Sequence, residues 1–277
     1  MAEPNKNPNE MTFFEHIEVL RWHLFRAAMS VVVISVILFS AKKFVFQYVI
    51  LYPISPDFPT YKIMCRISSQ LCFFPSNLQI ITRDIQEQFI CHIKVSLWLG
   101  FILSFPYIFY EFWKFIKPGL YKKEIIAARG MVFICSFLFL LGVSFGYFLI
   151  SPVAITFLSS YSVSPDVANT TTLASLVNNM TMFTLPTGLI FEMPVVMFFL
   201  AKIGIVSGSF LAQYRRHAIV IITILAAVIT PTADAFTMTL VGIPLYALYE
   251  VSIIVTRRID KEKAAAEKAE EKMDDDE

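Results

Sequence analysis

Two ionisable residues lie inside long apolar stretches of this chain and are its first candidates for chemistry. Lys94 falls within residues 85–106, and Glu192 begins a strongly apolar run. A charge at mid-membrane costs at least about 2.5–3.5 kcal/mol, so such groups usually face a cavity, a partner or water. Lys94 could also reach the membrane surface or pair internally. Glu192 is the stronger functional candidate, because Pro194 frees backbone groups that could form a polar pocket with it.

A third candidate is an acidic residue that follows two lysines in a polar loop. Glu124 comes after Lys122 and Lys123, at the end of a segment that joins aromatic residues to a Pro-Gly pair. Aromatic residues are typical of the membrane–water interface, so the simplest interpretation is an aromatic belt followed by a solvated turn. Glu124 could bind a cationic ligand or merely neutralise the neighbouring lysines.

Residues 13–26 combine an apolar helical stripe with a charged face that carries Glu18 and Arg21. This pattern indicates an amphipathic helix on the membrane surface that leads into the first span. A surface helix is the plainest interpretation. Together with Glu124, however, Glu18 would place acidic groups on one membrane face, where an arginine-bearing peptide could dock through bidentate ion pairs. Glu250, near the end of the last apolar segment, is more simply structural.

The composition indicates which kind of molecule must position these side chains. The chain has 277 residues, of which 56% are hydrophobic and 16% are charged. Soluble proteins have roughly 45–50% and 25% respectively. The mean hydropathy is +0.63, and the net charge is only +1. These values exclude a disordered, collagen-like or nucleic-acid-binding chain and favour an integral membrane protein.

We predict an all-α membrane protein with six transmembrane helices. We expect the last two spans to be short. A bilayer core about 30 Å thick needs about 20 residues per helix, and the fifth segment has too few apolar residues for a full crossing. A long loop over residues 47–84 separates the first two spans. Residues 1–258 form the membrane domain and 259–277 a charged tail; the expected spans are 27–46, 85–106, 125–150, 176–201, 217–230 and 235–256.

The lysines and arginines near the segment ends predict the orientation. Most lie on one side of the predicted membrane, and basic residues near span ends favour the cytoplasm. Both termini are therefore expected to be cytoplasmic. The even number of spans agrees with this, because it places both termini on the same side of the membrane. The residues on the other side are Lys42, Lys43, Lys62, Arg66 and Arg83.

The cysteines and histidines argue against metal or cofactor chemistry. Cys91 and Cys135 lie in apolar segments and are expected to be core residues. Cys65 and Cys72 lie seven apart in a polar loop and could form a disulfide if that loop faces an oxidising compartment. The sequence has no metal-ligand spacing, no nucleotide-binding motif and no catalytic constellation within the spans. We therefore expect no metal, no cofactor and no enzymatic activity.

Several motifs in the same order resemble TatC, the multispanning receptor of the twin-arginine protein translocase. The resemblance covers about residues 11–258. Residues 16–24 are similar to the family pattern H-L-x-E-L-R-x-R-L, and residues 106–124 are similar to its first cytoplasmic loop. Residues 191–194 resemble F-E-x-P, and residues 243–250 resemble I-P-x-Y…E. The family's acid in the first motif aligns with Val19, one position after Glu18, and His23 replaces a usual arginine.

The resemblance implies a cupped bundle with cytoplasmic termini that binds twin-arginine signal peptides of folded cargo. It implies a multi-pass protein of the bacterial cytoplasmic (inner) membrane, driven by the proton-motive force. It further implies self-association and docking of small single-span TatA- or TatB-type subunits along spans 5 and 6. The residues of the signal-peptide surface would be Phe115, Pro118, Leu120, Lys122 and Glu124, together with Glu18 and Arg21. Glu192 would contact the partner subunits within the membrane, and Lys94 matches an Ile-Lys pair of the family at the start of span 2. Pro53 resembles a proline in the family's first periplasmic loop.

Two other classes of function remain open from the residues alone. A secondary transporter or channel for a small solute would use Glu192 and Lys94 as coupling residues. It predicts that the purified protein moves a solute across liposomes. A purely structural scaffold predicts no contact with a signal peptide.

Overall fold

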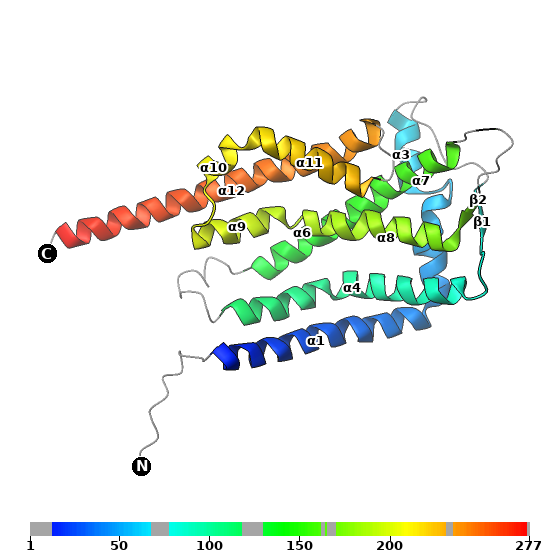
Figure 1. Cartoon of the computed structure of the whole chain (residues 1–277), viewed down its shortest axis with the longest axis horizontal. Helices are drawn as coiled ribbons and strands as arrows, with labels where there is room; N and C mark the ends of the chain where they lie inside the picture. Colours follow the sequence, from blue (N-terminus) through cyan, green and yellow to red (C-terminus); the bar gives the residue numbers. More distant parts are fainter. Residues whose placement is uncertain are drawn as a thin grey trace, which may run out of the picture. The chain divides into compact units, whose positions relative to one another are not determined.

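The computed structural model describes residues 13–67, 78–117, 130–161, 164, 170–230 and 235–275 (Figure 1). The chain forms two compact units. The first comprises Met1–Lys42 with His92–Phe137, and the second comprises Lys43–Cys91 with Leu138–Glu277.

Five helices among the described residues are long and apolar enough to cross a membrane: Ile17–Ser40, Glu87–Ile116, Met131–Ser160, Leu173–Ile203 and Thr237–Ala265. The predicted class, a mostly helical multi-pass membrane protein, is therefore confirmed. Helix α11 (Arg215–Ile229) has 15 residues and coincides with the predicted short fifth segment. At 1.5 Å per residue it is about 22 Å long, which is less than a bilayer core of about 30 Å. The count of six spans stays a prediction.

In the first unit, helix α1 runs without a break from Phe13 to Ser40. The predicted boundary between a surface helix and a span, at residue 27, falls inside this helix, and the helix ends before the predicted span end at residue 46; both span bounds stay predictions. Residues 13–40 contain no glycine or proline, so nothing interrupts the backbone hydrogen bonds until the turn at Ala41. The residues that could capture a ligand and the first apolar span therefore share one rigid helix.

Helix α4 (Glu87–Ile116) packs closely on α1 within this unit. A Cβ atom at Gly100 would come within 2.1 Å of the Ser35 hydroxyl oxygen. Ser96 and Ser104 are also buried, one helical turn to either side of Gly100. Small residues at such spacing allow membrane helices to approach closely.

Pro106, the predicted end of the second span, lies inside α4. A proline removes one backbone donor, but membrane helices tolerate this when their surroundings satisfy the freed carbonyl group. The helix continues to Ile116. As a result, Glu111 and Phe115 lie on a helix, where the sequence indicated a loop.

The second unit contains most of a composite helix built from α6 (Met131–Phe145), a π-helical turn η5 (Gly146–Ile150) and α7 (Ser151–Ser160). The helix therefore continues past the predicted span end at residue 150. Pro152 cannot donate to the carbonyl group of Phe148, but the Thr60 hydroxyl donates to it. A partner distant in sequence thus allows the helix to pass the proline.

The predicted loop over residues 47–84 contains short elements. They are α2 (Lys42–Val45), η1 (Phe46–Ile50), η2 (Tyr52–Ile54), α3 (Pro59–Ile67) and strand β1 (Gln79–Ile81). Strand β1 pairs in parallel with β2 (Thr170–Thr172), with Gln79 opposite Thr170. The Glu87 carboxylate accepts hydrogen bonds from the backbone N–H of Arg83 at 2.7 Å and of Ala174 at 2.8 Å. Glu87 therefore joins the start of α4 to the start of the helix that begins at Leu173.

A buried aromatic cluster organises this segment around Phe58, whose ring contacts those of Tyr61 and Tyr147. The Tyr147 hydroxyl donates to the carbonyl oxygen of Val49 at 2.8 Å. Pro53 lies four residues after Val49 and has no backbone N–H group that could donate to this carbonyl oxygen. Burial raises the pKa of the Tyr61 hydroxyl to about 12.

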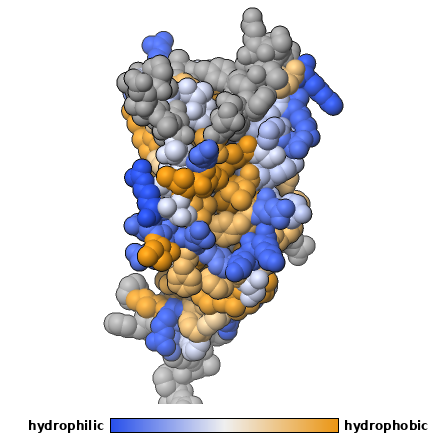
Figure 2. All heavy atoms as spheres, turned by 90° about the vertical axis from the view of Figure 1, so that its right-hand side faces the viewer, coloured by the Kyte–Doolittle hydropathy of each residue, from blue (hydrophilic) through white to orange (hydrophobic). Residues whose placement is uncertain are grey.

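Figure 2 looks onto the end that carries β1 and β2 and shows hydrophilic residues among apolar ones.

The next candidate span is divided into α8 (Leu173–Ile190) and α9 (Met193–Ile203). The division falls at Phe191 and Glu192, because Pro194 in the first turn of α9 cannot continue the hydrogen bonds of α8. Close contacts hold α8 against the composite helix. A Cβ atom at Gly188 would lie 2.9 Å from the Phe139 ring.

The chain ends in α10 (Gly208–Gln213), α11 and the long helix α12 (Ala235–Asp275), which lie side by side in Figure 1. A buried core that includes Phe183, Ala226 and Leu245 joins these helices to α8. Helix α12 continues through the predicted boundary at residue 258. The Asp260 carboxylate accepts from the Gly208 N–H at 2.7 Å, so the start of the tail is anchored to α10.

Candidate functional site

The structure places the predicted ligand-binding residues in three groups. Glu18, Arg21 and Phe115 lie in the first unit on α1 and α4. Glu192 and Pro53 lie in the second unit. Four further residues of the predicted surface and one cysteine lie outside the described residues: Pro118, Leu120, Lys122, Glu124 and Cys72.

The strongest polar contact in the first unit joins α1 to α4. The Nδ1 atom of His23 lies 2.6 Å from a carboxylate oxygen of Glu111. The Glu111 side chain is only 3% exposed, and the His23 side chain is 16% exposed. A contact this short and this buried is worth considerably more than an ion pair on an open surface.

Two aromatic residues on α4 complete this cluster. Tyr107 hydrogen-bonds Glu111 one turn away, and the His23 ring packs edge-on against Phe115, with 6.3 Å between ring centres. Tyr107, Glu111 and Phe115 are spaced by four residues, so they form one stripe along α4. We call His23, Tyr107, Glu111 and Phe115 the α1–α4 cluster. It brings together an acid, a histidine and one predicted member of the ligand surface.

Glu18 and Arg21 are exposed on α1, before the α1–α4 cluster. The Arg21 guanidinium carbon lies 5.9 Å from the centre of the Trp22 ring. The Glu18 side chain is therefore accessible from solvent, and its role in ligand binding stays a prediction. On α4, the amine of Lys114 lies 4.5 Å from the centre of the Tyr110 ring, which is the contact expected of interfacial residues.

The two intramembrane ionisable residues differ in their surroundings. Lys94 is exposed on α4. Glu192 is 8% exposed and lies at the break between α8 and α9, next to Pro194. The structure thus places Glu192 at an irregular backbone position, where a buried polar group near a helix break is compatible with a functional role.

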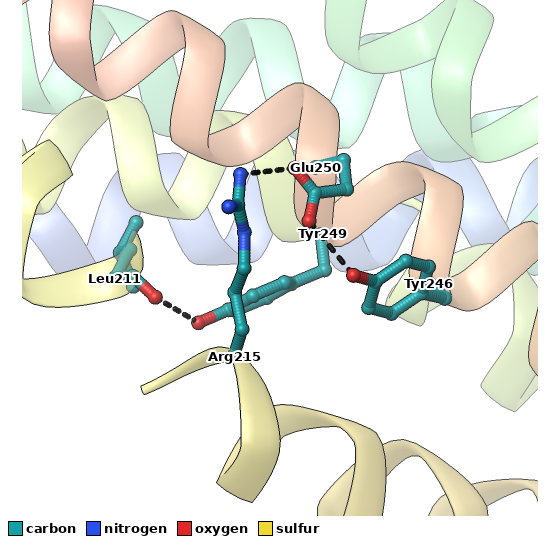
Figure 3. A network of polar contacts seen from close by, with 5 residues as sticks. All are labelled: Leu211, Arg215, Tyr246, Tyr249 and Glu250. Atoms are coloured by element: carbon teal, nitrogen blue, oxygen red, sulfur yellow. Dashed lines mark hydrogen bonds and ion pairs between the residues drawn. The ribbon is translucent and has the colours of Figure 1, made fainter. Parts of the chain in front are cut away.

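A second polar network lies at the start of α11 (Figure 3). A guanidinium nitrogen of Arg215 donates to a Glu250 carboxylate oxygen at 2.8 Å, and the Tyr246 hydroxyl donates to the other oxygen at 2.9 Å. The Tyr249 hydroxyl donates to the Leu211 carbonyl group at 2.7 Å. The network ties α10 and α11 to α12. This agrees with the structural interpretation of Glu250.

A groove lies beside this network, between α11 and α12, with a volume of about 500 Å³. Its lining is mainly apolar, with hydroxyl groups from two threonines and a tyrosine. The lining residues are Ile219, Ile222, Thr223, Met238, Thr239, Gly242, Ile243 and Tyr246. An apolar surface with a few hydroxyl groups suits the side of another membrane helix.

Pro53 and Cys65 lie in the short elements of the second unit. Pro53 is buried in η2, and its carbonyl group accepts from the Tyr61 hydroxyl at 2.8 Å. Cys65 is disulfide-bonded, whereas Cys91 and Cys135 are buried in the core as predicted. The pairing of Cys65 with Cys72 stays a prediction. Within the described ranges, no group of His, Cys, Asp or Glu side chains could hold a metal ion.

Sequence reasoning did not identify His23 and Glu111 as a pair. The two residues are 88 positions apart, and Pro106 suggested that Glu111 lies in a loop. One signal was available. Tyr107, Glu111 and Phe115 recur every four residues, as they would on one face of a continuing helix.

Comparisons with known proteins agree on one family. The family model described as Sec-independent protein translocase protein (TatC) matches residues 15–244. The chain belongs to the TatC family. A TatC protein of Blattabacterium sp. subsp. Periplaneta americana is 41% identical over 262 residues, covering 92% of this chain and 98% of that protein. TatC of Aquifex aeolicus is 31% identical over 260 residues, covering 94% of this chain and 100% of that protein.

A solved structure supports the same assignment at the level of the fold. The crystal structure of the twin-arginine translocase receptor TatC is 31% identical to this chain and superposes with a TM-score of 0.67. It covers 89% of this chain and 100% of the solved chain. The TatC-type arrangement of helices therefore holds for nearly the whole chain.

Proposed function

We propose that this chain is the receptor for twin-arginine signal peptides and the core subunit of a translocase that exports folded proteins. The main support is its match to the solved twin-arginine translocase receptor over 89% of its length. The translocase would work in the bacterial cytoplasmic membrane and use the proton-motive force. Its six spans would leave both termini in the cytoplasm, which agrees with the distribution of basic residues.

The signal-peptide surface would be built on the first unit. Phe115, held by His23, would form its floor, and Glu18 would supply one exposed acid. Glu124 would supply a second acid. Each arginine of the signal peptide would pair with a carboxylate, and a charge-assisted hydrogen bond contributes roughly 1.5–3 kcal/mol. Family membership favours this receptor over the small-solute transporter.

The role of Glu124 is tested by Glu124→Ala in native membranes. We expect capture of a twin-arginine peptide to fall about tenfold or more, because one arginine loses its carboxylate partner. The measurement is cross-linking yield against peptide concentration. Glu124→Asp keeps the charge and should retain most of the binding. Undiminished, arginine-dependent capture by Glu124→Ala would exclude this residue from the site.

We propose that the α11–α12 groove holds the single transmembrane helix of a small TatA- or TatB-type subunit. Its lining suits a helix, and it lies on the two segments expected to meet partners. The hydroxyl groups of Thr223, Thr239 and Tyr246 could hydrogen-bond a polar side chain of that helix, which stabilises membrane helix pairs. Self-association of the receptor would leave this groove free for each copy's partner.

Gly242→Leu tests this docking surface. A Cβ atom at Gly242 would have no neighbour within 4 Å, so the new side chain would fill the groove without disturbing the chain's own packing. Replacing glycine within a helix also favours folding by up to about 1 kcal/mol. We expect the variant to fold normally and to lose most of the partner that co-purifies with the wild type. Val251→Leu, on an exposed part of α12 outside the groove, is the control. Equal co-purification by both variants would contradict the proposal.

A further inference from the structure

A second groove lies in the first unit, between α1 and α4, with a volume of about 520 Å³. One side chain from α4, Tyr107, closes it against a stretch of α1. The residues from α1 are Phe25, Arg26, Met29, Ser30, Val33 and Ile34. From Phe25 to Ile34 the helix rises about 14 Å, which corresponds to two and a half turns. The groove is therefore long enough to lie along a short apolar helix.

This groove is continuous with the α1–α4 cluster. Tyr107 lines the groove and hydrogen-bonds Glu111. Glu111 is joined to His23, and His23 packs on Phe115. On α1, His23 and Ser30 lie seven residues apart and thus on nearly the same side of the helix. A ligand that extends from Phe115 along this stripe of α4 would therefore reach the groove at Tyr107.

We infer that this groove seats the apolar segment that follows the twin arginines of a bound signal peptide. The inference rests on the proposed function, because it extends the same binding surface into the membrane. The small side chain of Ser30 lets a second helix approach α1 closely, which is how helices associate within lipid. The α1–α4 cluster would form the cytoplasmic end of the seat.

The charges fix which part of the peptide enters. Arg26 is the one charged side chain among the residues that line the groove. A second cation beside it would be repelled, so the twin arginines would remain outside, near the exposed acid Glu18. The neutral apolar segment meets no such repulsion. This arrangement orients the peptide with its arginines at the membrane surface and its apolar segment along α1.

The rival occupant is a phospholipid, whose acyl chain could fill the groove while Arg26 holds its headgroup. A phospholipid would occupy the groove whether or not a signal peptide is present. Occupancy by the peptide must depend on the arginines, because they anchor it. Dependence on the twin arginines therefore distinguishes the two occupants.

The test places a photo-activated cross-linking amino acid at Val33 in the full chain in native membranes. Val32 is the matched control: it is 50% exposed, as is Val33, and is adjacent in sequence, but it does not line the groove. The probes are a labelled twin-arginine signal peptide and its Lys-Lys counterpart. We expect adducts of the twin-arginine peptide at Val33 that exceed those at Val32 at least fivefold, and few adducts of the Lys-Lys peptide.

Capture of the peptide is measured in the same samples by pull-down. If the twin-arginine peptide is captured but Val33 yields no more adduct than Val32, the inference about the groove is wrong and the proposed function stands. Phospholipid adducts alone at Val33 would likewise overturn the inference and leave the proposed function intact. If capture does not depend on the arginines at all, the proposed function fails, and the inference fails with it.

Discussion

His23→Ala is expected to lower the free energy of unfolding by about 3 kcal/mol, the upper end of the range for a hydrogen bond to a charged group. The effect follows from the position of Glu111, whose carboxylate is 3% exposed and lies 2.6 Å from the His23 ring. Without the histidine, this carboxylate stays buried with Tyr107 as its remaining partner in the cluster. The measurement is equilibrium unfolding of the purified protein in detergent micelles.

Two controls separate the hydrogen bond from simple loss of volume. His23→Arg supplies a cation that can bind a carboxylate through two hydrogen bonds, so this variant should retain most of the stability and the binding of the signal peptide. Combining His23→Leu with Glu111→Leu removes both polar groups and should cost less than His23→Ala alone. If His23→Ala and His23→Arg are equally destabilised, the contact with Glu111 does not hold α1 to α4.

Gly146→Ala is expected to destabilise the second unit by about 3 kcal/mol, near the upper end for inserting one methyl group into a packed interior. An added Cβ atom would lie 2.5 Å from the Phe183 carbonyl oxygen and 2.9 Å from the Thr184 Cα atom. Both are backbone atoms of α8, so no side chain can rotate away to make room. The helix itself must move, and thermal unfolding of the purified protein should show this.

Gly242→Ala is the matched control for this substitution. It makes the same chemical change in a helix of the same unit, with no neighbouring atom within 4 Å of the new Cβ atom. It should be neutral or stabilise the protein by up to about 1 kcal/mol. Similar stability of the two variants would show that the close contact between η5 and α8 does not exist in the membrane.

The apolar spans could be predicted from the sequence because lipid requires long uninterrupted apolar helices. Most differences between the predicted and observed span ends concern prolines. Local sequence rules predict helix ends near Pro106 and Pro152, yet both helices continue. The reason is visible for Pro152, because Thr60 satisfies the carbonyl group of Phe148. That partner is 88 residues away, and no local pattern in the sequence identifies it.

Only part of the candidate site could be predicted from the sequence. Glu18 is exposed on α1, whereas Phe115 lies on a helix and not in the loop that the sequence indicated. The pairing of His23 with Glu111 could not be predicted, since it depends on how α1 and α4 pack against each other. Periodicity predicts which face of one helix is apolar, but not which residue of another helix meets it.

The central claim, that this chain captures signal peptides through their two arginines, is tested most directly by a pull-down from native membranes. The full chain is incubated with a twin-arginine signal peptide or with its Lys-Lys counterpart. Arginine can hold a carboxylate through two hydrogen bonds, whereas lysine acts as a single point charge. We predict at least tenfold weaker capture of the Lys-Lys peptide. Equal capture of both peptides would contradict the account.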